Sequence, residues 1–403
     1  MSKFFHSAYR NLTPYTPGEQ PQDKKYIKLN TNESPFPPAP GVIEAVNASE
    51  AMDLRLYSDP ELKPLKAQLA ESFGVDTANV FIGNGSDECL NYAFMAFGED
   101  GFAFPDITYS FYKVIAELNH VQTDVKPLRA DFTIDLSDYL GPSTSEEANA
   151  DAGKTVVKAE GNQTSTGAQV DADKAAARGE GVPIKQKIYT GIGKAIVLPN
   201  PNAPTGIPIS LDAVAALCEA NPDHVVMIDE AYVDFADTAL SAVPLTKKYK
   251  NLLVTQTFSK SRSMAGARVG FAIGDAALIQ DLETLRNSNN PYNVNRISMK
   301  CAIEALKDTA YFEENCAKIR ANRAWTKAAL EELGFHVLKS QTNFLFAESP
   351  EISGKELYLR LKDNGVLVRH FDDPKITNFN RITIGSREEM EQFIETVKEI
   401  LSF

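Results

Sequence analysis

A lysine stands where an apolar segment of the chain ends. Leu252-Leu253-Val254, which predicts a buried strand, leads into Thr257-Phe258-Ser259-Lys260. Burial and neighbouring cations lower the pKa of a lysine amine, which can then attack a carbonyl compound to form a Schiff base. Taken alone, Lys260 is better explained as an exposed charge at a strand end. A catalytic role therefore depends on the residues that the fold places around it.

A carboxylate, Asp229, directly follows the apolar run Val225-Val226-Met227-Ile228. Buried charges need partners. A protonated pyridine nitrogen is a suitable one, because its protonation makes the ring an electron sink. Tyr232, a little further along, could donate to a phenolic oxygen on such a ring. The alternative is a capping or salt-bridged aspartate beside a tyrosine of the core.

A glycine-rich turn, Gly83–Glu88, follows Val80-Phe81-Ile82 and opens a predicted helix. Free backbone N–H groups and the positive end of the helix dipole make such a turn a phosphate cradle. It lacks the G-x-G-x-x-G spacing of dinucleotide binders, which favours a lone phosphate. Ser86 or Asp87 would also serve as an ordinary N-cap. Arg268 brings a bidentate donor to this region, unless it forms a surface salt bridge.

Two further residues suit a planar, anionic ligand. Tyr109 lies in a strand-to-helix turn and could stack on a ring, although core packing is the default for an aromatic residue. Arg381 starts a strand, and its guanidinium suits a carboxylate or phosphate. The polar clusters follow the carboxyl ends of predicted strands, the edge of an open α/β sheet where ligands bind. Together they predict pyridoxal 5′-phosphate (PLP), held on Lys260.

Short apolar runs followed by helical periodicity recur along the first two thirds of the chain. Strands that are apolar on both faces and alternate with helices are typical of a mostly parallel α/β sheet. The C-terminal third differs, because long helical stretches at 298–307 and 311–333 precede strand-like segments near 343–347, 366–369 and 381–384. That order predicts a smaller α+β domain.

The predicted organisation has three parts. An N-terminal arm (1–40) packs with the small domain (291–403), and a large PLP-binding domain (41–290) lies between them in sequence. From about Pro142 to Gly181 the chain is rich in Ala, Gly, Ser, Thr, Asp and Lys and has no aromatic residue. Such a segment buries too little apolar area to offset its ordering entropy, which predicts a flexible surface insertion over 142–190.

Composition excludes several classes of function. The net charge of −13 disfavours a nucleic-acid or anionic-membrane surface, because both repel an acidic protein. No secretory signal follows Met1, and no run of about 20 apolar residues predicts a membrane span. The four cysteines and five histidines lack metal-ligand spacing. We expect a cytoplasmic protein with reduced cysteines and no bound metal.

Several motifs, in order along nearly the whole chain, resemble those of fold-type I PLP aminotransferases. They are Pro201-Asn202-Ala203-Pro204-Thr205-Gly206, Asp229-Glu230-Ala231-Tyr232 and Thr257–Arg268. Lys28–Pro35 and Leu56-Tyr57-Ser58-Asp59-Pro60 resemble the histidinol-phosphate aminotransferase branch. The resemblance implies a large domain with a mostly parallel sheet, a smaller α+β domain, and PLP as cofactor.

The resemblance also implies roles at the matching positions. Lys260 would form the Schiff base and move the proton, Asp229 would hold the pyridine nitrogen, and Tyr232 the ring oxygen. Tyr109 would stack on the ring. The cofactor phosphate would be held by residues of the glycine-rich turn and of the lysine motif: Ser86 and Asp87 through their backbone, Ser259 and Arg268.

Other implied roles concern the substrate and a second copy of the chain. Tyr57 would reach the phosphate of the neighbouring subunit's cofactor, which makes a homodimer necessary for activity. The substrate pocket would be lined by Tyr15, Asn32, Arg369 and Arg381.

The chain departs from the family pattern at Ala203, where many relatives have an asparagine that hydrogen-bonds the ring oxygen. Asn202 could replace it through a shifted turn, or Tyr232 could act alone.

The expected activity is transamination between a small-molecule amino donor and a keto acceptor. Histidinol phosphate and 2-oxoglutarate would be converted to imidazole-acetol phosphate and glutamate, and the reverse, in histidine biosynthesis. An aromatic amino-acid aminotransferase and a phosphothreonine decarboxylase are alternatives on the same scaffold. A non-catalytic binding or regulatory protein is the alternative of another class, and Lys260, Asp229 and Tyr232 argue against it.

We predict that residues from about Pro142 to Gly181 can be replaced by a short Gly/Ser bridge without loss of fold or catalysis. Loop-closure entropy grows only slowly with loop length, so the insertion costs the fold little. Size-exclusion chromatography and steady-state kinetics of the deletion variant check this. A raised KM or a shift from dimer to monomer would instead identify the segment as a lid or a subunit contact.

Overall fold

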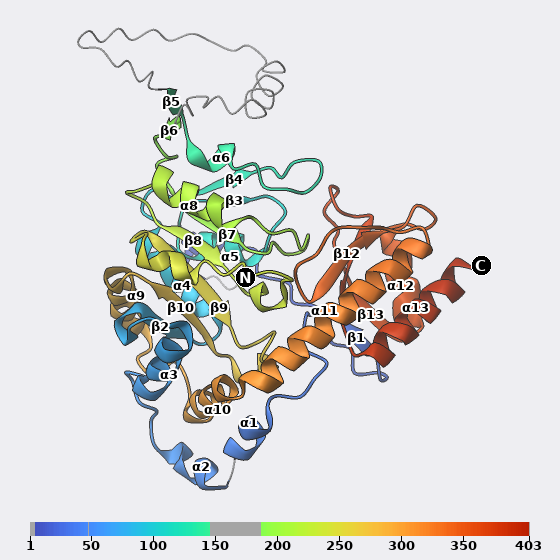
Figure 1. The fold of residues 1–403 in the computed structure, drawn as a ribbon, viewed down its shortest axis with the longest axis horizontal. Coiled ribbons are helices and arrows are strands. Elements are labelled where there is room, and N and C mark those ends of the chain that lie inside the picture. Colours follow the sequence, from blue (N-terminus) through green and yellow to red (C-terminus); the bar gives the residue numbers. More distant parts are fainter. Residues whose placement is uncertain (1–4, 47, 146–186, 403) are drawn as a thin grey trace, which may run out of the picture.

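The computed structural model describes residues 5–46, 48–145 and 187–402. Its largest element is a seven-stranded sheet (Figure 1). In spatial order its strands are β2 (Val80–Gly83), β10 (Gly270–Gly274), β9 (Leu252–Thr257), β8 (Val226–Asp229), β7 (Ala195–Pro199), β3 (Phe102–Pro105) and β4 (Thr123–Lys126). Strand β10 is antiparallel to both neighbours, and every other neighbouring pair is parallel. The mostly parallel α/β sheet is confirmed.

Both faces of this sheet are apolar because successive residues of its strands point to opposite sides. On β8, Val226 and Ile228 belong to one core cluster, whereas Met227 belongs to the cluster on the other face. All three side chains are fully buried. Polar side chains follow these buried residues at the carboxyl ends of β8 and β9, and this concentrates the chemistry at one edge of the sheet.

A second sheet of five strands lies beside the first in Figure 1. Its strands, in order, are β1 (Ile27–Leu29), β13 (Val366–His370), β14 (Phe379–Thr383), β12 (Phe344–Glu348) and β11 (His336–Val337). Strand β1 comes from the N-terminal segment and pairs in parallel with β13. The N-terminal segment is thus built into the second sheet, although the predicted domain boundaries remain a prediction.

Helices cover both sheets. Those that precede or flank the large sheet are α1 (Pro40–Ala45), α2 (Ala48–Met52), α3 (Lys63–Phe73), α4 (Ser86–Phe97), α5 (Phe111–Leu118), α6 (Ser137–Leu140), α8 (Leu211–Ala220), α9 (Ala276–Asn289) and α10 (Arg296–Lys307). The later ones are α11 (Thr309–Glu332), α12 (Gly354–Asp363) and α13 (Arg387–Leu401). Helix α11 runs from near α10 to the second sheet and thereby joins the two parts (Figure 1).

The predicted insertion over 142–190 lies mostly outside the described residues. Its two ends, however, form a short antiparallel pair, β5 (Ser143–Ser145) with β6 (Lys187–Tyr189). The composition of the segment had not predicted these strands. The two strands pair through backbone hydrogen bonds, and the side chains of this segment show no alternation that would predict them.

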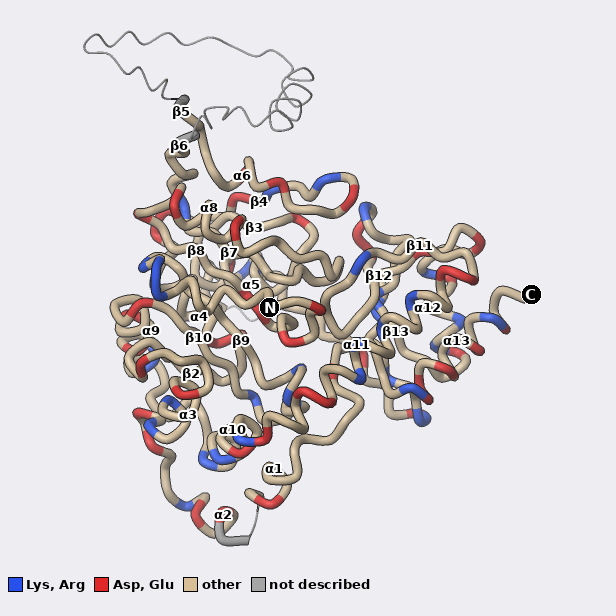
Figure 2. The backbone as a smooth tube through the Cα atoms, viewed as in Figure 1, with Lys and Arg blue, Asp and Glu red and all other residues tan. Residues whose placement is uncertain are grey.

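Acidic and basic residues are interspersed over the parts of the backbone visible in Figure 2. Among the described residues, no helix has the length and apolarity needed to cross a membrane. Within the same residues, no three His, Cys, Asp or Glu side chains form a group suited to a metal ion.

Candidate active site

A cavity of about 270 Å³ lies where the carboxyl ends of the large sheet meet the second sheet and the N-terminal segment. It is lined by nearly every residue that the sequence singled out: Tyr15, Asn32, Ser86, Asp87, Tyr109, Asp229, Tyr232, Ser259, Lys260, Arg268, Arg369 and Arg381. Tyr57 and Asn202 are the exceptions. The topology thus gathers residues that are far apart in sequence.

Lys260 follows the end of β9 and extends toward the N-terminal segment, where its Nζ donates to the carbonyl of Thr31 at 3.2 Å. Burial, followed by the positive charge of Arg381, lowers the pKa of the lysine to about 8. Near neutral pH a useful fraction of the amine is therefore unprotonated, as a nucleophile or proton carrier requires.

Asp229 is the last residue of β8 and only 5% exposed. Its Oδ2 accepts a hydrogen bond from Tyr112 Oη at 2.8 Å, and its Oδ1 accepts one from the Ala231 N–H at 3.3 Å. Burial raises the pKa of the carboxyl to about 6, although these hydrogen bonds favour the charged form and act in the opposite direction. The site therefore holds a costly carboxylate that a cationic ligand would stabilise.

Helix α4 starts at this cavity. Gly85 precedes it with φ +79°, and a Cβ there would stand 2.6 Å from Arg268 Nη2. A Cβ on Gly270 would stand 2.2 Å from the Ser86 nitrogen. The positive φ favours glycine at position 85, and position 270 requires it because a Cβ there would collide with the backbone at the start of α4. The result is a helix N-terminus with a guanidinium beside it, as anion binding requires.

Side chains from neighbouring elements complete this end of the cavity. Asp87 accepts from Arg268 Nη2 at 3.1 Å and from Tyr109 Oη at 2.9 Å. Arg268 Nη1 also lies 3.5 Å from Ser259 Oγ. Burial, followed by the charge of Asp87, raises the pKa of Tyr109 far above its ordinary value, so its hydroxyl stays protonated.

The opposite wall comes from the second sheet. Arg369 on β13 and Arg381 on β14 are directly paired across the two strands. Arg381 Nη2 donates to the Asn30 carbonyl at 3.1 Å, and its buried Nε has no protein partner. Like charges directly opposite each other destabilise a sheet unless an anion lies between or beside them. This wall is therefore suited to a carboxylate or a phosphate.

The N-terminal segment closes the cavity from outside. Arg369 donates to the carbonyls of Pro17 at 3.4 Å and Thr16 at 3.3 Å. The ring of Tyr15 stands edge-on to Tyr109, with 6.2 Å between centroids. Asn32 adopts the left-handed conformation, with φ 56°. Its Nδ2 donates to Tyr232 Oη at 3.0 Å and its Oδ1 accepts from Thr383 Oγ1 at 3.0 Å.

Comparison with known proteins identifies the family. Residues 24–397 match the family model described as aminotransferase class I and II. The chain belongs to this family. Over its whole length it is 45% identical to a histidinol-phosphate aminotransferase of Brachyspira hyodysenteriae, covering 100% of this chain and 99% of the relative. It is 44% identical to a protein of the same name from a Marinomonas species, covering 99% and 100%.

Solved structures agree on the aminotransferase fold. A histidinol-phosphate aminotransferase from Sinorhizobium meliloti, in complex with pyridoxal-5′-phosphate, is 25% identical with a TM-score of 0.73. The similarity covers 94% of this chain and 92% of that one. An L-threonine-O-3-phosphate decarboxylase from Porphyromonas gingivalis is 18% identical, with a TM-score of 0.70 over 93% and 99% of the two chains. The fold alone therefore does not distinguish these reactions.

Two predicted site residues of this aminotransferase lie away from the cavity. Asn202 Nδ2 donates to the Ile107 carbonyl at 3.0 Å and to Thr205 Oγ1 at 3.1 Å, while its Oδ1 accepts from Thr108 Oγ1 at 3.1 Å. These bonds occupy the amide within the turn, and Ala203 lines the cavity instead. The structure thus does not bring Asn202 to the position that the missing asparagine would take.

Tyr57 is 79% exposed and stacks on Tyr292, with 4.4 Å between ring centroids. It does not line the cavity of its own chain. Tyr112, by contrast, contacts Asp229 directly but was not predicted from the sequence. A tyrosine on the buried face of a strongly apolar helix such as α5 is indistinguishable from a core residue until the fold places its hydroxyl.

We predict that Tyr112→Phe raises the pKa of Asp229 further, by roughly one pH unit, because the variant lacks a hydrogen bond that stabilises the charged carboxylate. Asp229 is charged above its pKa, so PLP affinity should be lost at a higher pH as the solution is acidified. Fluorescence titration of the apo protein with PLP between pH 5 and 8 measures the midpoint. An unchanged midpoint would show that Tyr112 does not control this carboxylate.

Proposed function

We propose that this aminotransferase interconverts histidinol phosphate and imidazole-acetol phosphate, with 2-oxoglutarate and glutamate as the second pair, in histidine biosynthesis. The observation that carries the proposal is full-length identity of 44–45% to relatives named for this reaction. The residues of the cavity support it, because they combine an amine, a buried carboxylate and paired guanidinium groups.

PLP is the cofactor, and the residues present fit it. The buried Asp229 carboxylate has two hydrogen-bond donors and lacks a cationic partner among the contacts described above, so it suits a protonated pyridine nitrogen. The start of α4 lines the cavity at Ser86 and Asp87, beside Arg268, so its backbone N–H groups suit a phosphate group. When bound, PLP supplies an aldehyde that captures amines and a ring that withdraws electrons.

The remaining side chains hold and orient this group in our proposal. Ser86 and Asp87, through their backbone N–H groups, together with Ser259 and Arg268, would bind the phosphate. Tyr109 would pack against the ring, and Tyr232 would donate to its oxygen. All of these residues line the same cavity.

Lys260 Nζ would take the proton from the substrate carbon that bears the amine. It would then deliver that proton to the carbon of the cofactor's aldehyde group. A base works best when its pKa is near the working pH, and the pKa of Lys260 is about 8. The burial that lowers this pKa also keeps water away from the proton in transit.

Substrate anions would be recognised by the opposite wall. Arg369 and Arg381, with Tyr15 and Asn32, would bind the phosphate of histidinol phosphate and the carboxylates of glutamate. A second cavity of about 600 Å³ lies beside the first, and Tyr109, Arg369 and Phe371 line both. That second cavity gives room for substrates of different length to share one anion site.

A homodimer is part of the proposal. Exposed apolar side chains gather near Tyr57, with Met52 76%, Leu54 56% and Leu56 45% exposed. Burying such side chains against a second copy would be favourable. Tyr57 would then reach the phosphate end of the partner's cofactor. We also place the enzyme in the cytoplasm, where the cysteines stay reduced; those in the described residues are free and buried.

A substrate panel tests the proposed function. The purified enzyme with PLP and glutamate should aminate imidazole-acetol phosphate with a far higher kcat/KM than phenylpyruvate. A preference for phenylpyruvate would favour the aromatic aminotransferase, and carbon dioxide release from phosphothreonine would favour the decarboxylase. Absence of a PLP absorption band would favour a non-catalytic protein.

We predict that Lys260→Ala reduces transamination by roughly a thousandfold or more while PLP still binds without a covalent bond. The variant loses both the nucleophile and the proton carrier, whereas the phosphate and ring contacts come from other residues. Single-turnover kinetics and equilibrium dialysis with PLP provide the measurements. Retention of more than a few per cent of turnover would remove Lys260 from the mechanism.

We predict that Asp229→Ala lowers kcat by roughly a hundredfold or more, and lowers PLP affinity less. Without the carboxylate the pyridine nitrogen loses its proton, which weakens electron withdrawal mainly in the transition state. Steady-state kinetics at saturating PLP separate the two effects. A variant with normal kcat that merely needs more PLP would reduce Asp229 to a binding residue.

A further inference from the structure

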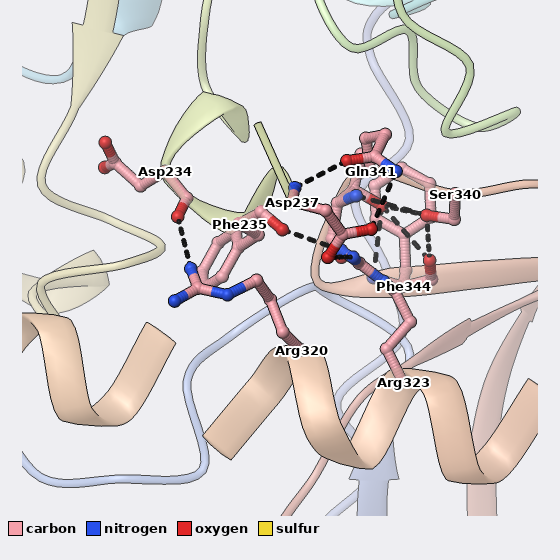
Figure 3. A network of polar contacts seen from close by, with 9 residues as sticks. Asp234, Phe235, Asp237, Arg320, Arg323, Ser340, Gln341 and Phe344 are labelled. Carbon is pink, nitrogen blue, oxygen red and sulfur yellow. Dashed lines mark hydrogen bonds and ion pairs between the residues drawn. The ribbon is translucent and has the colours of Figure 1, made fainter. Parts of the chain in front are cut away.

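A buried arginine of α11 joins the two parts of the molecule (Figure 3). Arg323 is only 4% exposed. Its Nη1 donates to the carbonyls of Phe235 at 2.8 Å and Thr342 at 2.7 Å, and its Nη2 donates to Asp237 Oδ1 at 2.7 Å. A buried cation persists only where such partners replace its lost hydration. These partners come from two segments, one just after Tyr232 and one just before β12.

The first segment, residues 233–237, begins with a short 3-10 helix, Val233–Phe235, for which Tyr232 is the N-cap. Its far end is fixed by a reciprocal amide contact (Figure 3). The Asp237 N–H donates to Gln341 Oε1 at 2.6 Å, and Gln341 Nε2 donates to Asp237 Oδ2 at 2.9 Å. Arg323 therefore donates to a segment that is also hydrogen-bonded to Gln341, in the loop before β12.

The near end of the same segment contacts the residue that follows Lys260. Asp234 Oδ2 accepts from Ser261 Oγ at 2.5 Å, and Ser261 directly follows Lys260. The Asp234 carbonyl accepts from Arg320 Nη1 at 3.4 Å. Arg320 and Arg323 are one turn apart on α11, so the helix presents both guanidinium groups to one segment.

We infer that Arg323 is a positioning residue that fixes Tyr232 and Lys260 relative to the second sheet. It does not line the cavity and acts through residues 233–237. Its planar fork donates to three acceptors at set angles, and a lysine ammonium cannot reproduce that geometry. The kinetic part of this inference rests on the proposed function, whereas the structural part does not.

Two variants and one control test the inference. Arg323→Lys keeps the positive charge but lacks the planar guanidinium group that donates to three acceptors. Asp237→Asn weakens the ion pair from the other side, at a side chain that is 55% exposed. Asn322→Ala is the control, because the neighbouring Asn322 is also buried but donates to the Gly385 carbonyl, away from the segment. Hydrogen exchange of the apo proteins and steady-state kinetics of the PLP-loaded enzymes are measured for all three.

In Arg323→Lys we expect faster amide exchange over residues 233–237 and unchanged exchange in α4. We expect kcat to fall roughly ten- to a hundredfold with a smaller change in KM, since small misplacements of reacting groups act mainly on the chemical step. Asp237→Asn should show the same pattern more weakly. Asn322→Ala should leave kcat within about twofold of the wild-type value, because the contact it removes does not involve residues 233–237.

The inference is overturned if Arg323→Lys and Asn322→Ala have the same kcat and the same amide exchange over residues 233–237. If Arg323→Lys fails to fold, Asp237→Asn decides, and wild-type exchange and kcat in that variant would overturn it equally. If the wild-type enzyme does not convert histidinol phosphate, the proposed function fails. Exchange over residues 233–237 in the apo proteins then decides the inference by itself.

Discussion

The site depends on a carboxylate that the sheet buries at its edge. Asp229 and its neighbour Glu230 are both buried, and burial raises the pKa of Asp229 to about 6 and of Glu230 to about 7. Glu230 receives hydrogen bonds from the Ala242 N–H, Ser241 Oγ and Gln256 Nε2. Asp229 accepts from Tyr112 Oη and the Ala231 N–H and lines the cavity. Because a buried charge needs compensation, hydrogen bonds from the protein offset part of the cost at both carboxylates, and only Asp229 of the two lines the cavity, where a cationic ligand would stabilise it.

The charges of the cavity are divided between its two walls. Strand β8 of the large sheet contributes Asp229 and helix α4 contributes Asp87, whereas the second sheet contributes the cross-strand pair Arg369 and Arg381. Lys260 lies between them, and its pKa is lowered by burial and by Arg381. The same arginine that suits an anionic substrate therefore also helps to keep the lysine amine unprotonated. Binding of an anion beside Arg381 would weaken that effect and make Lys260 more basic.

The parts predictable from sequence are those that local patterns specify. Strands β2 and β8 and the first half of β9 are apolar on both faces, and the polar clusters that follow them indicated Asp229 and Lys260. The antiparallel direction of β10 was not predictable, because it is set by pairing with β2 and β9 rather than by its own residues. Arg323 was missed for a related reason: two of its partners are backbone carbonyls, which leave no trace in sequence.

Tyr232 is held by polar contacts that come from outside the large sheet. Its hydroxyl accepts from Asn32, and Asn32 is in turn held by Thr383 and by Asn343, whose Nδ2 donates to the Asn32 carbonyl at 3.0 Å. Tyr232 is thus held from one side by the second sheet through Asn32 and from the other through residues 233–237. The side-chain partner of the tyrosine hydroxyl is therefore Asn32 of the N-terminal segment, which follows β1 and is fixed to the second sheet by Thr383. The relative placement of the two sheets therefore determines where the tyrosine hydroxyl lies, and rigid packing of α11 becomes a requirement of the chemistry as well as of the fold.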